Sequence, residues 1–333
     1  NWNEPTNWST NAVPLAAGSV TIPITANKPA LAGNVIIANF NMTAGSGLNF
    51  NGFTLSVTAA TSIAGATLTN SNGSTDIVLS INSAGGAGTN YIGGTTFSDN
   101  ATINCNGTGT TYEGYTTGNI YNGNTIFNLN GTGYFYSSYS QKSSFGGNLT
   151  VTRTGVGNTE LFNSGFNFIT GNFSYTNNAG GNTFINNSNV LSGSINGTVN
   201  ITAAGAGNPS FYLKKIKNLT GGGTISVQNS GYTLIQNDTL TVTTINISGF
   251  TGGNSDDFSN NLITGNLTFA EGATNTGSVY TGNNTINGST TLGLNSAATW
   301  YEGYQVGNVY NGNTSFSLNG TGTFNSSYST KCS

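Results

Sequence analysis

One pattern constrains this sequence more than any other: a glycine followed by a short stretch in which polar and apolar residues alternate. Two of the thirteen starts lack the glycine. The starts are Gly33, Gly52, Gly73, Asp99, Gly123, Gly147, Gly171, Gly197, Gly222, Thr243, Gly265, Gly288 and Gly312. From Gly123 to Gly312 the chain makes eight steps of about 24 residues. A period of this length is typical of repeat architectures, in which each unit stacks on the next.

Each step contains three short segments separated by corners. The first alternates, as in Thr125–Leu129, which is the period of a half-buried strand. A Gly-rich corner such as Gly131–Gly133 leads to a second, aromatic segment, and a third ends on an apolar residue before the next start. We therefore predict an all-β fold, a right-handed parallel β-helix (β-solenoid) of about 23–24 residues and three short strands per rung. A β-sandwich does not explain a register kept over eight steps.

The two ends of the chain differ in composition. Residues 1–30 hold Trp2, Trp8 and four of the five prolines. Because an open rung is an unpaired strand edge, we interpret residues 1–30 as a cap, with Trp2 or Trp8 laid over the first rung. A platform for stacking on sugars is the alternative interpretation of these tryptophans. Residues 31–333 are predicted to form about 12–13 rungs, in a solenoid expected to continue beyond residue 333.

One long stretch of sequence occurs twice in the chain. Residues 112–142 and 301–331 match at 23 of 31 positions. The run contributes most of the tyrosines that gather on the second segments: Tyr112, Tyr115, Tyr136, Tyr139, Tyr301 and Tyr304. These rings either pack in the core and corners or form an exposed row that binds a glycan or a partner surface.

Composition excludes several functions. Only 5% of residues are charged and the net charge is −3, so the basic stripe that nucleic-acid binding needs is missing. No apolar run reaches the ~18–20 residues that span a bilayer. Without histidine, Ser-His-Asp chemistry is excluded, and two cysteines do not make a zinc site. We expect no cofactor, and the low charge favours lateral or end-to-end self-association.

Carboxylates decide whether an enzyme is plausible. A β-helix polysaccharide lyase or glycosidase needs a carboxylate pair, and only Asp238 and Asp256/Asp257 fall on adjacent rungs. We interpret them as a surface charge patch beside Lys214 and Lys215; the turn 252–257 makes Asp238, Asp256 and Asp257 weak Ca²⁺ candidates. An ice-binding solenoid would need a regular threonine face, but the equivalent positions vary. The sequence therefore favours a protein that is not an enzyme.

The opening W…NW…VP…G-x-V-x-I-P and the rung motifs G-N-T-x-F, N-G-T-G and Y-N-G-N-T resemble repetitive surface proteins of Bacteroidota. These include gliding-motility adhesins and other cargo of the type IX secretion system. The resemblance implies secretion to the cell surface and an adhesive or filament-forming role. Asp238-Thr239-Leu240 resembles the O-glycosylation site of that phylum, at Thr239. We expect a stiff structural and adhesive segment of a long extracellular protein or fibre, which mediates or spaces attachment to a polysaccharide or another surface ligand.

Overall fold

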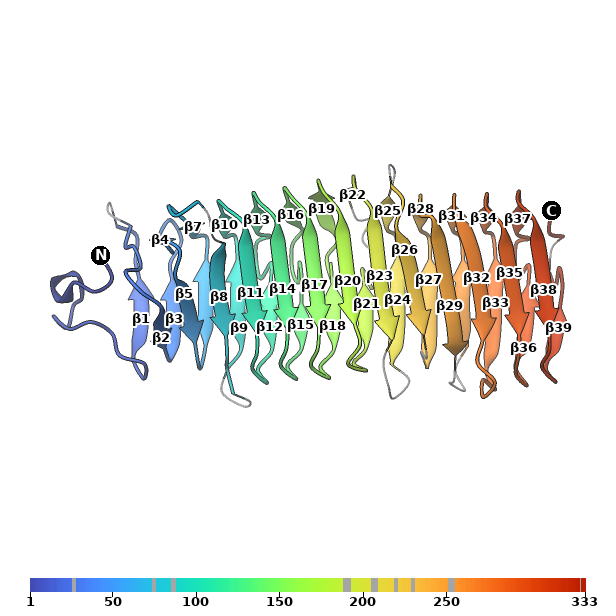
Figure 1. Ribbon diagram of the computed structural model, residues 1–333, viewed down its shortest axis with the longest axis horizontal. Helices are drawn as coiled ribbons and strands as arrows, with labels where there is room; N and C mark the ends of the chain where they lie inside the picture. The colour runs from blue at the N-terminus through green and yellow to red at the C-terminus, as the bar shows by residue number, and fades with distance from the viewer. Residues whose placement is uncertain are drawn as a thin grey trace. The chain divides into compact units, whose positions relative to one another are not determined.

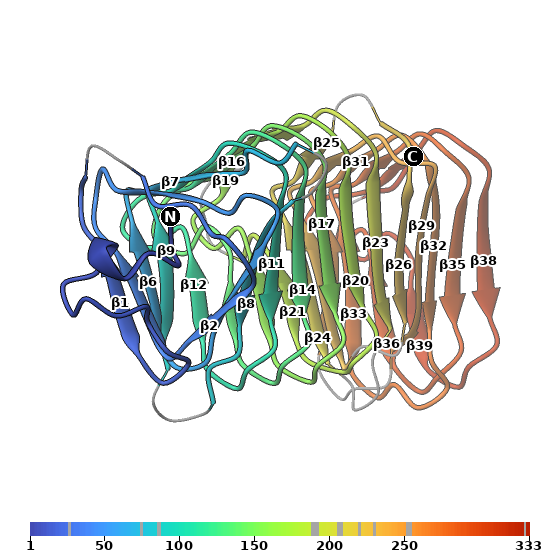
Figure 2. The same cartoon turned by 60° about the vertical axis from the view of Figure 1, so that its left-hand side comes forward.

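A computed structural model describes residues 1–25, 28–73, 76–84, 88–187, 193–204, 209–218, 221–228, 231–250, 255–329 and 331–333. The chain divides into two compact units, which we call unit 1 (Asn1–Gly171) and unit 2 (Asn172–Ser333). Apart from a single 3-10 turn, η1 (Pro5–Asn7), all the regular structure in the described residues is β-strand. In each unit the chain visits three parallel sheets in turn, which we call sheets A, B and C (Figures 1 and 2).

In unit 1, every strand pairs in parallel with the equivalent strand of the neighbouring rung (Figure 1). Sheet A contains β1 (Ser19–Ile22), β3 (Asn39–Met42), β6 (Thr61–Ala64), β9 (Asn90–Gly93), β12 (Thr111–Glu113), β15 (Phe135–Tyr136) and β18 (Thr159–Leu161). Sheet B contains β4 (Gly47–Asn49), β7 (Thr67–Thr69), β10 (Thr96–Phe97), β13 (Ile120–Tyr121), β16 (Ser143–Phe145) and β19 (Phe166–Ile169). Sheet C contains β2 (Val35–Ile37), β5 (Thr54–Val57), β8 (Ile77–Ile81), β11 (Ala101–Cys105), β14 (Thr125–Leu129) and β17 (Leu149–Arg153).

Unit 2 repeats the same three-sheet arrangement. Sheet A contains β21 (Thr183–Ile185), β24 (Ser210–Lys214), β27 (Tyr232–Gln236), β30 (Asp256–Ser259), β33 (Ser278–Gly282), β36 (Thr299–Glu302) and β39 (Thr323–Asn325). Sheet B contains β22 (Ser194–Ile195), β25 (Lys217–Asn218), β28 (Thr239–Leu240), β31 (Leu262–Ile263), β34 (Thr285–Ile286) and β37 (Val309–Tyr310). Sheet C contains β20 (Phe173–Asn177), β23 (Val199–Ala204), β26 (Thr224–Gln228), β29 (Thr244–Phe250), β32 (Asn266–Glu271), β35 (Thr290–Leu294) and β38 (Thr314–Leu318).

The predicted fold class is confirmed: both units are parallel β-solenoid, with about 12 rungs between them. Each of the thirteen sequence starts lies just before one strand of sheet C; Gly123 precedes β14 and Gly312 precedes β38. Alternation along these strands directs every second side chain inward. In β14, Thr125, Phe127 and Leu129 are buried, and Phe127 stacks in register between Ile103 and Val151 of the neighbouring rungs. One rung cannot enclose these side chains alone, so the stack builds the core.

The N-G-T-G motif forms the corner between sheets C and A, where the backbones of neighbouring rungs approach closely. A Cβ atom added to Gly131 would lie 1.8 Å from the carbonyl oxygen of Gly107, and one added to Gly155 would lie 2.0 Å from that of Gly131. No side chain fits at such distances. From inside the rung, the buried Arg153 guanidinium donates to the carbonyls of Gly131 (3.0 Å) and Gly133 (3.1 Å). The corner thus requires glycine for space.

The corner between sheets A and B imposes a different requirement, a residue with positive φ. In unit 2 three successive rungs use asparagine there: Asn237 (φ 60°), Asn260 (59°) and Asn283 (54°). Asparagine tolerates this left-handed conformation better than most residues. Unit 1 places Thr116 (61°) and Ser138 (50°) at the same corner, so other contacts must hold these residues in place.

Candidate functional site

Tyr112 and Tyr136 lie on the outward face of sheet A in unit 1, and Tyr115 and Tyr139 join them from the corners that follow these strands. Tyr112 and Tyr136 occupy register-paired positions of β12 and β15, and their rings stack at 5.1 Å and 11°. Tyr139 meets Tyr112 edge-on at 4.4 Å and lies nearly parallel to Tyr115 at 6.2 Å. Two further rings extend the group, and we call all six the unit 1 tyrosine cluster: Tyr91, Tyr112, Tyr115, Tyr134, Tyr136 and Tyr139.

Unit 2 contains an equivalent group on its own sheet A. We call it the unit 2 tyrosine cluster: Tyr280, Tyr301, Tyr304 and Tyr328. Tyr280 and Tyr301 stack at 5.1 Å and 8°, and Tyr328 meets Tyr301 edge-on at 4.7 Å. Each member follows a member of the unit 1 tyrosine cluster at the same sequence offset that separates Tyr301 from Tyr112. The two clusters therefore repeat in geometry as well as in sequence.

The tyrosines face outward because their neighbours in the strand face inward. In β12, Thr111 and Glu113 are buried and Tyr112 between them is half-buried. Of the clustered rings, Tyr134 (48%), Tyr304 (37%) and Tyr328 (54%) are the most exposed. Rings of this kind offer an apolar face for stacking and a hydroxyl for hydrogen bonds. Together they form a surface suited to a flat ligand with both apolar and hydroxyl groups.

Beneath the unit 1 tyrosine cluster, the buried carboxylate of Glu113 connects two rungs. Its Oε1 accepts hydrogen bonds from Asn119 Nδ2 (2.7 Å), Tyr121 OH (3.3 Å) and Ser143 Oγ (2.6 Å), and its Oε2 accepts one from the Ser138 N–H (2.7 Å). Burial raises the pKa of Glu113, and these donors offset part of that effect. The hydrogen bond from the Ser138 N–H to Oε2 also holds Ser138 in its left-handed conformation. Glu113 is therefore a corner-organising group rather than an exposed acid.

Glu302 repeats this arrangement in unit 2. Its carboxylate accepts hydrogen bonds from Asn308 Nδ2 (2.9 Å), Tyr310 OH (3.0 Å) and the Ser327 N–H (2.9 Å). Where Ser143 donates to Glu113, the thiol of Cys332 donates to Glu302 at 2.7 Å. Cysteine and serine are alike in size, so the thiol fits the same place as a weak donor.

Asp238 belongs to a buried column at the corner between sheets A and B of unit 2. The column continues through Asn261, Asn284 and Asn308. The side-chain oxygen of each asparagine accepts a hydrogen bond, at 3.0 Å, from the backbone N–H of the preceding member of the column, one rung earlier. Asp238 Oδ1 likewise accepts the Ile216 N–H at 2.7 Å, but its Oδ2 is buried without a partner. Burial raises the pKa of Asp238 well above its ordinary value, although the backbone N–H groups of Ile216 and Gln236 offset part of this effect.

The expectation of a surface charge patch is therefore wrong for Asp238 and Asp256. Both are 1% exposed, and Asp256 accepts the Thr233 N–H at 2.6 Å instead of pairing with a lysine. Burial raises the pKa of Asp256 to about 8. The reason is the phase of sheet A, which directs these positions into the core. Asp257, one residue on, is half-buried on the outward face and accepts a hydrogen bond from Gln236.

The weak Ca²⁺ candidates do not form a ligand set. Asp238 and Asp256 hold backbone amides in separate rungs, and Asp257 faces the opposite side of its strand. Across the described residues, no three Cys, Asp or Glu side chains come close enough to hold a metal ion together. The residues 252–254 of the glycine-rich turn lie outside the part of the chain that the structure describes.

The ice-binding alternative would require a regular array of threonines among the residues that face outward from sheet C. In unit 2 one outward column of sheet C is mixed: Thr202, Ser226, Asn246, Thr268, Thr291 and Ser315. In unit 1 the column from Val78 to Thr150 includes Thr102 and Ile126. These faces lack a regular threonine array, as the sequence indicated.

The tryptophans of the N-terminal segment have different surroundings. Trp2 is buried at 1% exposure, and its carbonyl accepts a hydrogen bond from Trp8 Nε1 at 2.8 Å. The two rings meet edge-on at 4.8 Å. Trp8 is half-buried and borders a hollow of about 800 Å³ together with Pro23 and Lys28. Of the two, only Trp8 has a face open to a ligand.

The predicted glycosylation site also lies within the described residues. Thr239, the predicted glycosylation residue, is half-buried within sheet B, and its N–H donates to the Ile216 carbonyl at 2.8 Å.

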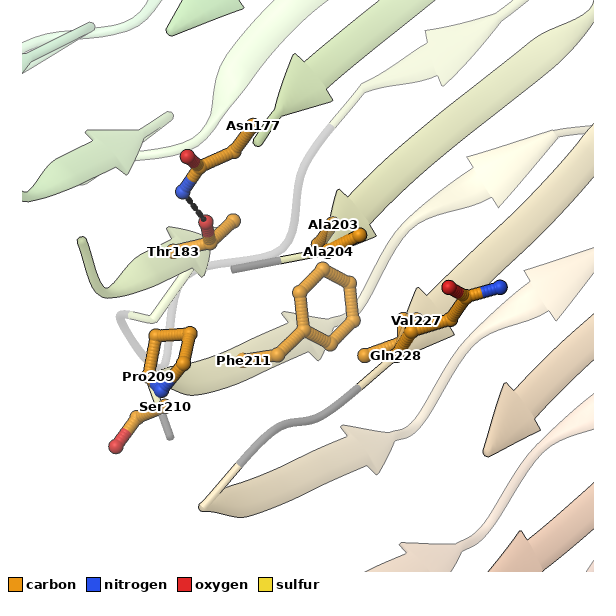
Figure 3. Close-up of a pocket in the computed structure, with 9 residues that line it drawn as sticks. All are labelled: Asn177, Thr183, Ala203, Ala204, Pro209, Ser210, Phe211, Val227 and Gln228. Carbon is orange, nitrogen blue, oxygen red and sulfur yellow. Dashed lines mark hydrogen bonds between the residues drawn. The ribbon is translucent and has the colours of Figure 1, made fainter. Parts of the chain in front are cut away.

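In unit 2 a small cavity lies around Phe211, beside the hydrogen bond from Asn177 Nδ2 to Thr183 Oγ1 (Figure 3). Its volume of about 10 Å³ is enough for one water at most, so it is no ligand site.

Comparison with known proteins leaves the fold as the main finding. No protein-family model, curated protein or solved structure matches the chain. Among the described residues there is also no helix with the length and apolar character needed to cross a membrane. The chain is a β-solenoid, and its function has to be argued from its own surfaces.

Sequence reasoning missed several members of the tyrosine clusters and the whole inward network. Tyr91 and Tyr280 share the sequence offset of the other pairs but lie outside the run that drew attention to them. Extending the comparison upstream would have found both. Glu113 gave a weaker signal, because nothing local distinguishes an inward acid from an outward one in a strand of three residues.

Proposed function

We propose that this chain is a structural and adhesive segment of a long extracellular surface protein, which attaches to glycans through its tyrosine clusters. The observation that carries the proposal is the recurrence of one geometry in both units: stacked rings 5.1 Å apart on sheet A, with an edge-on tyrosine from the corner. A folded core needs no such outward rings. Exposed aromatic groups with polar rims are characteristic of interaction sites.

The scaffold contributes stiffness. Each strand pairs on both sides except at the ends of a stack, and corner glycines hold neighbouring backbones in contact. Low charge and the likeness to Bacteroidota surface proteins support an extracellular location. We place the activity in binding rather than catalysis because Glu113, Asp238, Asp256 and Glu302 are buried and occupied with structural hydrogen bonds.

Adhesion under flow tests the proposal. Beads coated with the full chain are passed over agarose- and dextran-coated glass, and the retained fraction is counted. The test variant changes the most exposed cluster tyrosines, Tyr134, Tyr304 and Tyr328, to serine. Each aromatic contact contributes about 0.5–1.5 kcal/mol, so losing them should reduce retention at least tenfold.

A matched variant controls for loss of exposed apolar area. It changes Leu15 (78% exposed), Ile36 (54%) and Val156 (65%) to serine, all outside the tyrosine clusters. We expect it to retain as many beads as the parent chain. Equal losses in both variants, or no retention of the parent on either polysaccharide, would contradict the proposal.

A further inference from the structure

A surface pocket of about 290 Å³ lies beside the unit 2 tyrosine cluster. It spans the outward side of β27, β30 and β33 and the corner that follows β36. Its lining is Gln236, Asp257, Ser259, Asn260, Tyr280, Gly282, Asn283, Tyr304, Gln305 and Val306. The volume is close to the lower end of the ~300–1,000 Å³ range of small-ligand sites.

Two tyrosines form the aromatic wall of the pocket. The ring centroids of Tyr280 and Tyr304 lie 4.7 Å apart with planes inclined at 58°. The corner that carries Tyr304 is fixed, since the Asn283 N–H donates to the Val306 carbonyl at 2.8 Å. Asn283 Nδ2 also donates to Asn260 Oδ1 at 2.7 Å. The wall is therefore part of the rung structure and is formed before any ligand arrives.

The floor of the pocket is polar. Gln236 Nε2 donates to Asp257 Oδ2 at 2.7 Å and lies 3.3 Å from Ser259 Oγ. Burial raises the pKa of Asp257, while Ser259, Gln236 and the charge of Lys214 lower it. An amide, a hydroxyl and a carboxyl group thus stand side by side on β27 and β30, the two strands that precede Tyr280 in sheet A.

The unit 1 tyrosine cluster lacks this floor. In unit 2 Asp257 precedes Tyr280 in register and Ser259 precedes Gly282. At the corresponding places in unit 1, Ser62 precedes Tyr91 and Ala64 precedes Gly93. The rings are shared between the units, but the polar groups on the neighbouring strand are not. This difference indicates that the unit 2 pocket has a recognition task of its own.

We infer that this pocket binds one neutral pyranose ring of a glycan, with the sugar stacked on Tyr280 and Tyr304 and its hydroxyls held by Gln236, Asp257 and Ser259. The inference rests on the proposed glycan adhesion and specifies where selectivity resides. Aromatic faces suit the apolar face of a sugar, and convergent polar groups fix its orientation. The carboxyl of Asp257 disfavours an anionic sugar at the same position.

Saturation-transfer NMR and calorimetry with methyl galactoside, methyl glucoside and methyl mannoside test the inference on the full chain, with glucuronate as the anionic comparator. At least one neutral glycoside should bind, and glucuronate should bind at least tenfold more weakly. Tyr304→Ala should weaken glycoside binding at least tenfold. Gln236→Ala, which removes an amide donor without touching the wall, should weaken it severalfold.

Leu262→Ala is the control, because Leu262 is 43% exposed in unit 2 and lies outside the pocket lining. It should leave binding within twofold of the parent, with circular dichroism confirming the fold of each variant. Binding that survives Tyr304→Ala and Gln236→Ala would overturn the inference. If no glycoside binds while beads still adhere through tyrosines, the pocket inference fails and the adhesive function stands. If glycosides bind in the pocket but beads do not adhere, the adhesive function fails and the sugar site remains.

Discussion

The unpartnered carboxyl oxygen of Asp238 provides the most quantitative test of this structure. Asp238 occupies the first place of a column that continues with Asn261 and Asn284. In Asn261 the amide nitrogen donates both to the Ile235 carbonyl and to Asn284 Oδ1, each at 3.0 Å. Asp238 Oδ2 is buried with no partner. Asp238→Asn would place an amide nitrogen at that point, facing Asn261 Oδ1.

The expected difference in unfolding free energy between Asp238→Asn and the parent has two parts. The first part is small where Asp238 is neutral: the protonated carboxyl carries an O–H that can donate as the amide would, so the variant recovers only a fraction of the about 1–3 kcal/mol that a buried polar atom without a partner costs. The second part depends on pH. Because the folded pKa of Asp238 is raised above the unfolded value, its favourable contribution is complete below about pH 4 and is lost as pH rises toward the folded pKa. The variant's advantage should widen by about 1.4 kcal/mol per pH unit over that range.

Urea unfolding followed by circular dichroism at pH 5, 6 and 7 measures this difference. Hydrogen exchange of peptides covering β27 and β28 locates it. Glu4→Gln, which removes an exposed carboxylate, is the control for the change in net charge. If Asp238→Asn is less stable than the parent at every pH, or if the difference stays constant from pH 5 to 7, the reasoning about Oδ2 is refuted.

Three further predictions concern the corners and the core. Gly131→Ala should destabilise unit 1 by more than about 2 kcal/mol through a backbone clash, whereas Gly33→Ala, with open space around its Cβ, should be nearly neutral in the same thermal melts. Glu113→Gln turns one acceptor into a donor facing the Ser138 N–H, so the urea midpoint should fall by the equivalent of about 1–3 kcal/mol; an unchanged midpoint would contradict the network. Asp256→Asn should flatten the loss of unit 2 stability between pH 5 and 8, because the raised pKa of about 8 makes the parent weaken as pH rises through this window.

The fold could be predicted because the period is carried by the strands of sheet C. Those strands run to five residues, as in β11 and β14, long enough for alternation to define an inward face. At some of the starts the glycine also meets a steric demand: a Cβ atom added to Gly123 would lie 2.7 Å from the backbone nitrogen of Asn100 in the preceding rung, whereas one added to Gly33 would meet nothing. In sheet C the alternation in the sequence therefore matches the packing of the strands, and the number of starts predicts the number of rungs.

The candidate site could not be predicted to the same extent, because the strands of sheet A are short. In Thr111–Glu113 the usual expectation would bury the ring of Tyr112 and expose the acid. The structure has the opposite phase. The Gly-rich corner before the strand leaves the phase open, and what determines it lies one rung away, in Ser138 and Ser143. A sequence pattern read along the chain does not contain that cross-rung information.

This explains why the long run is repeated almost completely. Its inward residues build the carboxylate network of Glu113 or Glu302, its outward tyrosines stack, and its corner glycines admit the neighbouring backbone; three independent demands fix most positions. The differences between the copies lie mainly where these demands are weak. On the outward face, Tyr136 of the first copy corresponds to Asn325 of the second. Unit 1 thus has a larger ring surface, while unit 2 has a polar pocket beside a smaller one. A shared framework with different outer groups suits the proposed adhesion, in which a repetitive glycan would be met at more than one kind of contact.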